Sequence, residues 1–382
     1  MSWVECTLGD MITLKRGHDL PARLRIEGSV PVVSSSGITG CHNESKAQPP
    51  GVVTGRYGTL GEVYFIDQEY WPLNTALYVI DFKNTNPRFA AYFLKNVLRN
   101  YKSDKAAVPG VDRNVLHALK VVAPDPRLQE PIAQVLSAYD DLIENNCRRI
   151  MLLEQSARLL YKEWFIHLRF PGHEHVKIID GVPEGWKKTT VSEVCSDFSD
   201  GDWIETKDQG GEDFRLLQVS NIGQNCFVET GNYRYVTEDT FRRLRCNEVV
   251  PGDILISRMP KPIGRAWYVH PNPWRMITAV DVTIARPDPE KVDPFFFLCH
   301  LNSDPHLARC EAHATGATRP RISRKNMGGL PILRPPMSLM TMFGEVARPT
   351  NHQKRVLTKQ NDLLTQSRDL LLPRLMNGNI SV

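Results

Sequence analysis

Several features of membrane and secreted proteins are missing from this 382-residue chain. It has no apolar run near the roughly 20 residues that a membrane helix needs, and Met1–Glu5 lacks a signal-peptide pattern. Its eight cysteines include no Cys-x-x-Cys pair, which fits reduced thiols better than a disulfide framework. A net charge of +4 also excludes a polycation. These absences predict a cytoplasmic protein, and the length of 382 residues predicts two or three domains.

Motifs for catalysis are also lacking. The chain has neither a Gly-x-x-x-x-Gly-Lys-Ser/Thr loop for a nucleotide phosphate nor the glycine fingerprint of a dinucleotide site. Gln48–Gly51 and Arg334–Met337 both fail the pattern of an acidic or amide residue followed by Pro-Pro-aromatic that adenine methyltransferases use. Pro287–Lys291 lacks the Glu-x-Lys spacing of a nuclease site. We therefore expect no catalytic residue in this chain.

Potential metal ligands gather in one short stretch of the sequence. They are Cys299, His300, His306, Cys310 and His313. Without the regular paired spacing of a zinc site, a half-buried helix is favoured over a metal site. His173–His175 lacks the His-Glu-x-x-His spacing and is expected to be a solvated loop. No metal site is predicted.

The chain contains an internal repeat. Thr7–Asp10 corresponds to Thr190–Glu193, and both have the Thr-x-x-acid form that caps the start of a short helix. Val52–Arg56 corresponds to Ile254–Arg258, and each is followed by a glycine and an aromatic strand. Such a layout predicts two similar modules.

Each copy closes with the same elements. Pro109–Asn114 falls on Pro320–Lys325, and a proline-bounded strand and a long helix follow. Apolar or permissive residues alternate in steps of four and three from Ile132 to Trp164, and again from Leu357 to Leu375. Such steps form the seam of a coiled coil, so we expect the two helices to pack on each other. The module that connects them allows an antiparallel arrangement.

One residue disturbs the second helix, because Pro349 is expected to break or kink it. A helical hairpin with no role in spacing the modules is the alternative interpretation of the two periodic segments.

The predicted fold is α+β. Two similar, β-rich mixed α/β recognition modules are separated by two long antiparallel helices in a pseudo-twofold repeat. The predicted boundaries are 1–125 for the first module, 126–170 for the first helix, 171–183 for a linker, 184–336 for the second module and 337–378 for the second helix.

Cations and small polar residues recur in turns at matching places of the two copies. Arginine can donate two hydrogen bonds to guanine, asparagine can do the same for adenine, and lysine or serine suits phosphate. The candidate DNA-binding residues are Ser35, Ser36, Arg56, Tyr57, Lys105, Arg113, Asn114, Asn221, Arg258, Lys261, Arg319, Arg321, Arg324 and Lys325. Any one surface cation can simply solvate the protein, but recurrence in both copies favours binding for the set.

Taken together, these features resemble the specificity subunit of a type I restriction-modification system, over essentially the whole chain. The resemblance is carried by the segments ending in Arg56 and Arg258, the loops 109–114 and 319–325, Tyr161–Phe165 and the tail Leu370–Gly378.

The resemblance implies a subunit without catalytic chemistry. In that family, two target recognition domains each bind one half of a split DNA site, and the helices set the unread spacer. Double-stranded DNA, two methyltransferase subunits and the restriction and translocase subunits are the implied partners. S-adenosylmethionine, ATP and Mg would serve those partners, with no cofactor bound by this chain.

Docking of the methyltransferase subunits is implied at the helices, because a repeated surface can bind one partner twice. The candidate docking residues are Trp164, Phe165, Leu371 and Leu375. Core packing between the helices is the alternative role for each of them.

Two other function classes remain as alternatives. A stand-alone DNA-modifying enzyme would act as a purified chain with a metal ion or methyl donor. A coiled-coil interaction scaffold would show no salt-sensitive binding to duplex DNA. Neither alternative explains why basic turns recur with the repeat.

Overall fold

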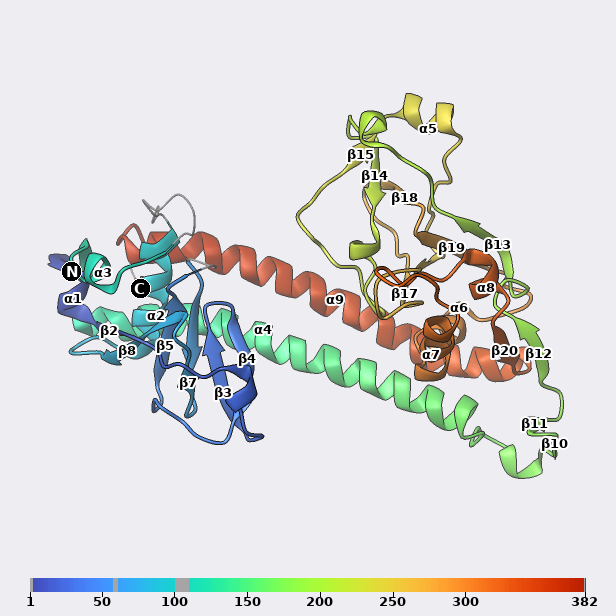
Figure 1. Cartoon of the computed structure of the whole chain (residues 1–382), viewed down its shortest axis with the longest axis horizontal. Helices are drawn as coiled ribbons and strands as arrows, with labels where there is room; N and C mark the ends of the chain where they lie inside the picture. The colour runs from blue at the N-terminus through green and yellow to red at the C-terminus, as the bar shows by residue number, and fades with distance from the viewer. Residues whose placement is uncertain (1–2, 58–60, 100–109, 381) are drawn as a thin grey trace. The chain divides into compact units, whose positions relative to one another are not determined.

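The computed structural model describes residues 3–57, 61–99, 110–380 and 382. The chain divides into two compact units, which we call unit 1 (residues 1–148 and 357–382) and unit 2 (residues 149–356). The boundary falls inside the long helices α4 (Pro126–Tyr161) and α9 (Met337–Met376), so each unit holds one β-rich module and part of both helices (Figure 1).

Unit 1 is built on two sheets and a separate strand pair. The antiparallel sheet β2-β8-β5-β6 comprises β2 (Thr13–Arg16), β8 (Ala76–Asp81), β5 (Gly51–Gly55) and β6 (Val63–Ile66). In the sheet β4-β3-β7, β3 (Val30–Ser34) runs antiparallel to β4 (Gly37–His42) and parallel to β7 (Trp71–Pro72). The remaining elements are the antiparallel pair β1 (Trp3–Thr7) and β9 (Lys120–Pro124), and the helices α1 (Leu8–Met11), α2 (Pro87–Arg99) and α3 (Arg113–His117).

Unit 2 repeats this plan strand for strand. Its antiparallel sheet β13-β19-β16-β17 comprises β13 (Cys195–Asp200), β19 (Val282–Pro287), β16 (Ile254–Ser257) and β17 (Ala266–Tyr268). Its second sheet places β14 (Phe214–Leu217) antiparallel to β15 (Tyr235–Val236) and parallel to β18 (Arg275–Thr278). The remaining elements are the pair β12 (Lys187–Thr190) and β20 (Pro331–Arg334), the hairpin β10 (Ile178–Ile179) and β11 (Val182–Pro183), and the helices α5 (Glu238–Leu244), α6 (Pro294–Leu301), α7 (Asp304–Ala312) and α8 (Arg324–Gly328).

The local predictions at the module entries differ in outcome. At the start of α1, the Thr7 hydroxyl accepts from the backbone N–H of Asp10 and the Asp10 carboxylate accepts from Thr7, so the predicted capping box is confirmed. In unit 2 the Glu193 carboxylate accepts from the backbone N–H of Thr190 at 2.9 Å. Residues 191–194 nevertheless form a turn, so the prediction of a capped helix is wrong there.

The predicted helix seam is confirmed by burial. Every seam position of α4 from Ile132 to Leu160, and of α9 from Leu357 to Leu375, is buried or half-buried. Trp164, at the end of the predicted seam, lies in the π-helical turn Lys162–Ile166 that follows α4. The expected break at Pro349 is wrong, because α9 continues through it as one helix.

The two helices run antiparallel within each unit. In unit 1, Asn146 donates to Asn361 at 3.0 Å, while the earlier residue Asp140 pairs with the later residue Arg368 at 2.5 Å. Asn146 is buried in an otherwise apolar seam. Because a buried polar pair is satisfied in one alignment only, this contact selects the register of the helices.

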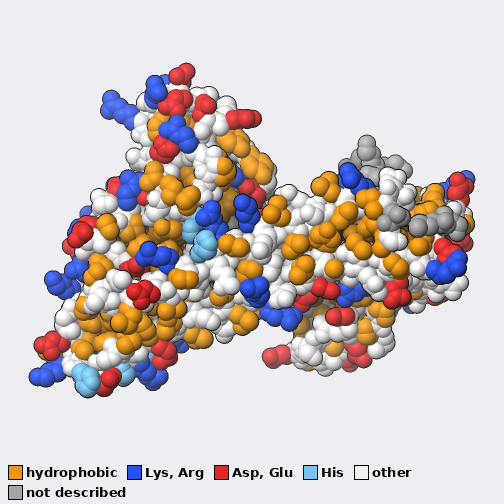
Figure 2. All heavy atoms as spheres, turned by 180° about the vertical axis from the view of Figure 1, so that it is seen from behind, with side chains coloured by type: hydrophobic (Ala, Val, Ile, Leu, Met, Phe, Trp, Pro, Cys, Tyr) orange, Lys and Arg blue, Asp and Glu red, His pale blue; other side chains and the backbone are white. Residues whose placement is uncertain are grey.

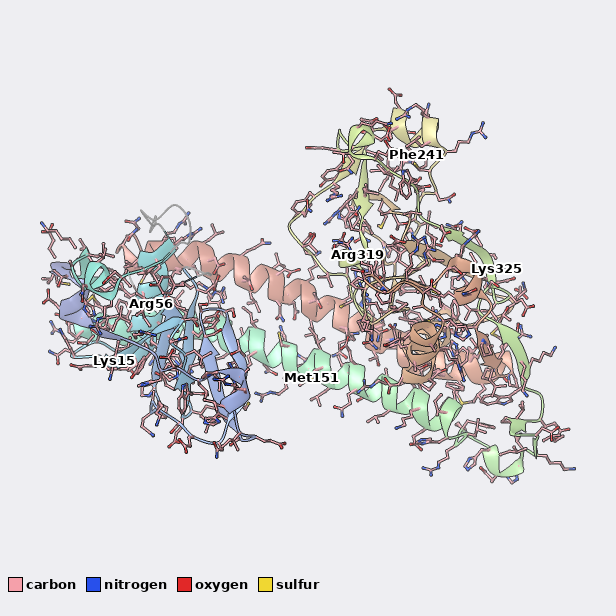
Figure 3. All side chains as sticks on the ribbon, in the orientation of Figure 1. Lys15, Arg56, Met151, Phe241, Arg319 and Lys325 are labelled. Carbon is pink, nitrogen blue, oxygen red and sulfur yellow. The ribbon has the colours of Figure 1, made fainter. Side chains whose placement is uncertain are left out.

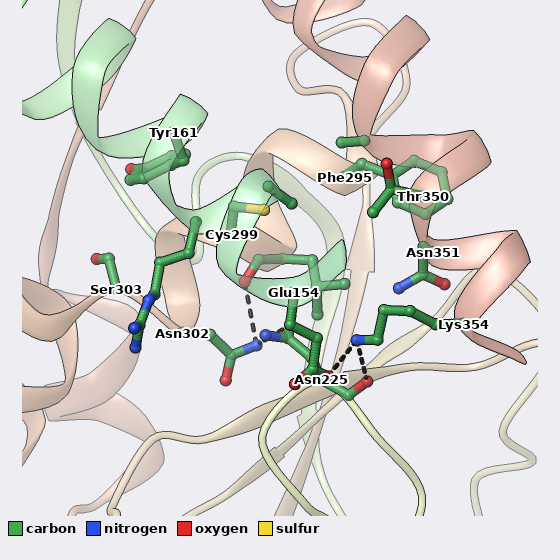
Figure 4. A pocket seen from close by; sticks show the side chains of 14 residues that line it. Glu154, Tyr161, Asn225, Phe295, Cys299, Asn302, Ser303, Thr350, Asn351 and Lys354 are labelled. Atoms are coloured by element: carbon green, nitrogen blue, oxygen red, sulfur yellow. Dashed lines mark hydrogen bonds and ion pairs between the residues drawn. The ribbon is translucent and has the colours of Figure 1, made fainter. Parts of the chain in front are cut away.

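Polar contacts fasten each module to the helices of its own unit. In unit 1, the Tyr92 hydroxyl of α2 donates to Asp140 of α4. In unit 2, Lys354 of α9 pairs with Glu154 of α4 and donates to the backbone oxygen of Asn225 at 3.5 Å (Figure 4). The Asn225 side chain in turn accepts from Asn302, the residue directly after α6, at 2.7 Å. The long helices are therefore part of the core of both units.

Replacement of Asn146 by leucine should lower the stability of the chain. The substitution removes the donor to the side-chain oxygen of half-buried Asn361, and leaving a polar group unsatisfied in a buried contact costs about 1–3 kcal/mol. The double replacement Asn146→Leu with Asn361→Leu should recover most of this loss, because both polar groups are then gone. Urea unfolding measures the effect, with exposed Asn145→Leu as the control. A double variant less stable than the single one would contradict the assigned pairing.

Candidate nucleic-acid interface

The sheet strands β5 and β16 deliver one arginine each to the same place in their modules. Directly after β5, the Arg56 backbone N–H donates to the carbonyl of Thr75 at 2.9 Å. Directly after β16, the Arg258 backbone N–H donates to the carbonyl of Asp281 at 2.9 Å. The predicted correspondence of the two segments is therefore confirmed by equivalent backbone contacts.

A second backbone contact aligns the loops that precede α3 and α8. Val111 donates to the carbonyl of Arg56 at 2.9 Å, and Ile322 donates to the carbonyl of Arg258 at 3.3 Å. This alignment puts Arg113 and Arg324 at equivalent places, since each is the first residue of its short helix.

In unit 1 the predicted residues gather around a hollow, which we call the arginine hollow. Its lining residues are Arg16, Arg56, Tyr57, Leu77, Val111, Asp112, Arg113 and Asn114. Arg56 lies beside the sheet β2-β8-β5-β6 (Figure 3), with its guanidinium carbon 4.6 Å from the centre of the Tyr57 ring. Arg113 and Asn114 are exposed at its rim. The sequence predictions missed Arg16, because only the pairing of β2 with β8 brings it here.

Two other predicted residues of unit 1 lie elsewhere. Ser35 and Ser36 form the turn between β3 and β4, outside the lining of the arginine hollow. Ser36 is bound locally, since its backbone N–H donates to the Ser34 hydroxyl at 3.1 Å. Lys105 lies outside the described residues. A DNA-binding role for these three residues stays a prediction.

Asn221 of unit 2 cannot bind DNA in this fold. Its side-chain oxygen accepts from the backbone N–H of Gln218 at 2.9 Å, and its side-chain nitrogen donates to the carbonyl of Val228 at 3.0 Å. The residue is buried. The prediction that Asn221 binds DNA is therefore wrong, because its amide closes a turn of the backbone.

The prediction that Arg258 reads a base is also wrong. The side chain is only 2 % exposed, and its Nη2 atom lies 3.5 Å from carboxylate oxygens of both Asp200 and Asp281. Nη2 also donates to the carbonyl of Val280. Burial lowers the pKa of the Arg258 guanidinium from its ordinary value, while the two carboxylates act in the opposite direction. The residue is an internal cation of the module and does not face solvent.

Two half-exposed arginines are held by the same aspartates. The Nε atom of Arg321 lies 2.9 Å from Asp281, and that of Arg324 lies 3.4 Å from Asp200. Arg324 also donates to the carbonyl of Phe198 at 2.9 Å. Their side chains are 45 % and 48 % exposed, so both remain accessible to a ligand.

The remaining predicted residues of unit 2 are exposed but dispersed. Lys261 pairs with Glu311, and Arg319 lies on a loop whose ends are joined by two hydrogen bonds of 2.9 Å between Thr315 and Arg321. Arg319 and Lys325 lie well apart in Figure 3. Arg319 and Lys325 therefore do not lie together in unit 2. Their role in DNA binding stays a prediction.

Charge of both signs is spread over the face shown in Figure 2. Lysine and arginine atoms alternate there with aspartate and glutamate atoms in both units. Attraction of DNA on this face would therefore depend on local clusters of cations, because no extended region of one sign covers it.

The docking predictions on the long helices are partly wrong. Phe165 belongs to the core of unit 2 and Leu375, at 2 % exposure, to the core of unit 1, so neither is available to a partner. Trp164 and Leu371 are partly buried against the same cores. The sequence predictions missed the apolar residues that the helices do expose, although these alternate with the seam positions. They are Leu142, Met151, Leu152, Leu159, Met342, Val346, Val356, Leu363 and Leu370 (Met151 is labelled in Figure 3).

The cysteine and histidine residues near α6 and α7 form a packed cluster. The His300 and His306 rings lie 4.9 Å apart, His300 contacts the Tyr161 hydroxyl at 3.1 Å, and His306 contacts Cys310 at 3.4 Å. Within the described residues, no three histidine, cysteine or acidic side chains are arranged to hold a metal ion. Burial lowers the pKa of both histidines, that of His306 to about 3.

Among the described residues, no helix combines the length and the apolar character that crossing a membrane requires.

Comparison with known proteins identifies the relatives of the chain. The profile of the type I restriction modification DNA specificity domain matches residues 1–155. The chain is similar to type I restriction-modification specificity subunits. It is 22 % identical over 291 residues to the type I restriction enzyme MjaIX specificity subunit of Methanocaldococcus jannaschii, covering 73 % of this chain and 65 % of that protein. The MjaVIII specificity subunit of the same organism is 21 % identical over 301 residues, covering 77 % of this chain and 70 % of the relative.

The fold of this chain is similar to that of a specificity subunit whose structure has been solved. The crystal structure of the type I restriction-modification S subunit from M. genitalium aligns with a TM-score of 0.62 and 19 % identity. The alignment covers 98 % of this chain and 96 % of that one. The two-module α+β fold is therefore shared with a specificity subunit.

Acid should destabilise unit 2 through the buried histidines. His306 has a pKa of about 3 in the fold and an ordinary value of 6.5, so the unfolded chain binds more protons between these values. The contribution of neutral His306 to the free energy of unfolding is therefore fully present above about pH 6.5, and it is lost progressively as the pH falls toward 3. Thermal unfolding across this range should show a shallower acid dependence for His306→Gln. The exposed control His175→Gln should keep the wild-type dependence, and a variant curve parallel to wild type would contradict the assignment.

Loss of the Arg258 side chain should act on folding before it acts on DNA. Arg258→Ala leaves two carboxylates without their buried partner, and breaking a buried ion pair costs about 3–5 kcal/mol. Arg319→Ala should change stability by less than about 0.5 kcal/mol, because exposed Arg319 has no such partner within the described residues. Urea unfolding of the two variants measures the difference. Equal stabilities would contradict the structural role of Arg258.

Proposed function

We propose that this chain is the DNA-specificity subunit of a type I restriction-modification complex and has no catalytic site of its own. Each of the two modules would read one half of a bipartite target in double-stranded DNA. The match of residues 1–155 to the specificity domain and the kinship with specificity subunits support this proposal.

The observation that carries the proposal is a repeated backbone with unlike side chains. The loops before α3 and α8 make equivalent contacts, but Asn114 of unit 1 corresponds to Lys325 of unit 2. The two modules thus offer different donors from the same position. Two half-sites of different sequence require that combination, because base edges are distinguished by the pattern of donors and acceptors.

The long helices would connect recognition to the partner subunits. Their shared register within each unit would set the unread spacer between half-sites. The exposed apolar residues of α4 and α9, such as Met151 and Leu370, would serve as contacts for two methyltransferase subunits. Restriction and translocase subunits would join that assembly. S-adenosylmethionine, ATP and Mg would be bound by these partners, and duplex bending would let the methyltransferase reach its adenine.

Replacement of two exposed cations of unit 2 should change one half of the target only. The chain is assembled with its methyltransferase subunits, and methylated adenines are mapped across a genome. With Arg319→Ala or Lys325→Ala, a lost base contact should cost about 1–3 kcal/mol and relax the sequence at one half-site. Loss of a phosphate contact would instead weaken binding to all sequences.

The matched control is Lys187→Ala on β12, an exposed lysine outside the candidate loops. It should leave the methylated sequence and the affinity unchanged. Methylation by the purified chain alone would refute the non-catalytic role. A single uninterrupted target in the assembled complex would refute the division of labour between modules.

A further inference from the structure

The two modules carry different side chains at one place where their strands pair in the same register. Gly55 of β5 pairs with Ala76 of β8, and Ser257 of β16 pairs with Val282 of β19. The next residue along β8 pairs with Arg16, whereas the next residue along β19 pairs with Asp200. Arg16 of unit 1 therefore takes the place of Asp200 in unit 2.

The same comparison of strand registers shows that a second aspartate of unit 2 corresponds to a neutral residue in unit 1. Thr75 precedes β8 directly and Asp281 precedes β19 directly, and their carbonyls accept from Arg56 and Arg258, both at 2.9 Å. Thr75 therefore takes the place of Asp281. Both carboxylates that surround the arginine of unit 2 have no counterpart in unit 1.

In unit 2 the arginine cluster contains its own anions. Three guanidinium groups, those of Arg258, Arg321 and Arg324, share the carboxylates of Asp200 and Asp281 at 2.9 to 3.5 Å. Acidic oxygens thus occupy the space between the cations, as a bound anion would.

In unit 1 the equivalent cluster lacks such anions. Among the described residues Arg56 and Arg113 have no ion pair, and Arg16 has only the exposed Asp19 at 3.5 Å. The one carboxylate in the lining, that of Asp112, accepts from the backbone N–H of Asn114 at 2.8 Å and caps α3. Three arginines consequently line a hollow of about 290 Å³.

The buried hydroxyl of Thr75 adds an independent observation next to Arg56. Its Oγ1 atom is buried and has no hydrogen-bond partner within the described residues. Buried hydroxyl groups are usually hydrogen-bonded, so this one lacks its usual partner at the place where unit 2 has the carboxylate of Asp281.

We propose that the arginine hollow binds one phosphate group of the DNA backbone, at the place where unit 2 holds the carboxylates of Asp200 and Asp281. The inference rests on the proposed DNA-binding function. Arginine presents several N–H donors in a plane, and phosphate oxygens accept them in pairs. Arg56 is then a phosphate contact and not a base reader. Unit 1 anchors the backbone here, and unit 2 neutralises the same position internally.

Salt dependence separates a phosphate contact from a base contact. The assembled complex is titrated with duplex DNA at several salt concentrations. Arg56→Gln should reduce the slope of log affinity against log salt by about 1. It should weaken binding to specific and unrelated DNA alike, and the methylated sequence should not change. Arg99→Gln, an exposed arginine at the end of α2, should leave the slope as in the wild type.

An exchange variant tests the comparison between the modules directly. Arg16→Asp with Thr75→Asp gives unit 1 the carboxylates of unit 2, and should lower the salt slope by more than Arg56→Gln does. Urea unfolding establishes that each variant folds. Should the exchange variant not fold, Arg16→Gln replaces it, with an expected loss of about 1 in the slope.

Inorganic phosphate is the second probe, applied to the full chain alone. It should raise the unfolding temperature of the wild type more than chloride does at equal ionic strength, and Arg56→Gln should abolish the difference. Protection by free phosphate with an unchanged DNA slope would show a small-anion site and overturn the backbone contact. An altered methylated sequence with an unchanged slope would make Arg56 a base reader. A wild-type complex that neither binds nor methylates DNA would refute the proposed function itself.

Discussion

Burial of the apolar seams of α4 and α9 is the constraint on which the rest of the structure depends. Neither seam is stable in water, so the helices pack on each other and on the modules of their own units. The Asn146–Asn361 hydrogen bond selects one register for this packing in unit 1. Asp140 accepts a hydrogen bond from Tyr92 of the first module, and Glu154 pairs with Lys354, which binds the backbone of the second module. The helices therefore help to hold each module in place.

The duplicated modules show how one backbone carries two electrostatic arrangements. The hydrogen bonds around Arg56 and Arg258 are nearly identical, so the fold does not distinguish the two positions. The side chains at neighbouring strand positions do. Asp200 and Asp281 convert Arg258 into an internal cation, whereas Arg16 adds to the positive charge around Arg56. An opposite charge nearby stabilises a buried charge, and unit 2 supplies two carboxylates beside Arg258.

Much of the fold could be predicted from periodicity and repetition. The helix seams from Ile132 and from Leu357 were visible because burial at a contact between helices imposes steps of three and four. Pro349 was expected to break or kink the second helix, but α9 continues through it as one helix, so the expected break is wrong. At the site, Asn221 and Arg258 were misassigned for one reason. A polar side chain in a turn can face solvent or bind groups inside the protein, and the local sequence does not distinguish these two cases.

The sequence by itself determined that the chain has two related modules and two paired helices, since these follow from spacing along the chain. It also placed cations near the ends of matching strands. Only the tertiary structure decided which of these cations are accessible. The pairing of β2 with β8 brings Arg16 toward Arg56, and the pairing of β13 with β19 brings Asp200 toward Arg258. These partners lie far apart in the sequence, and the electrostatic role of an arginine depends on the charges that the fold places around it.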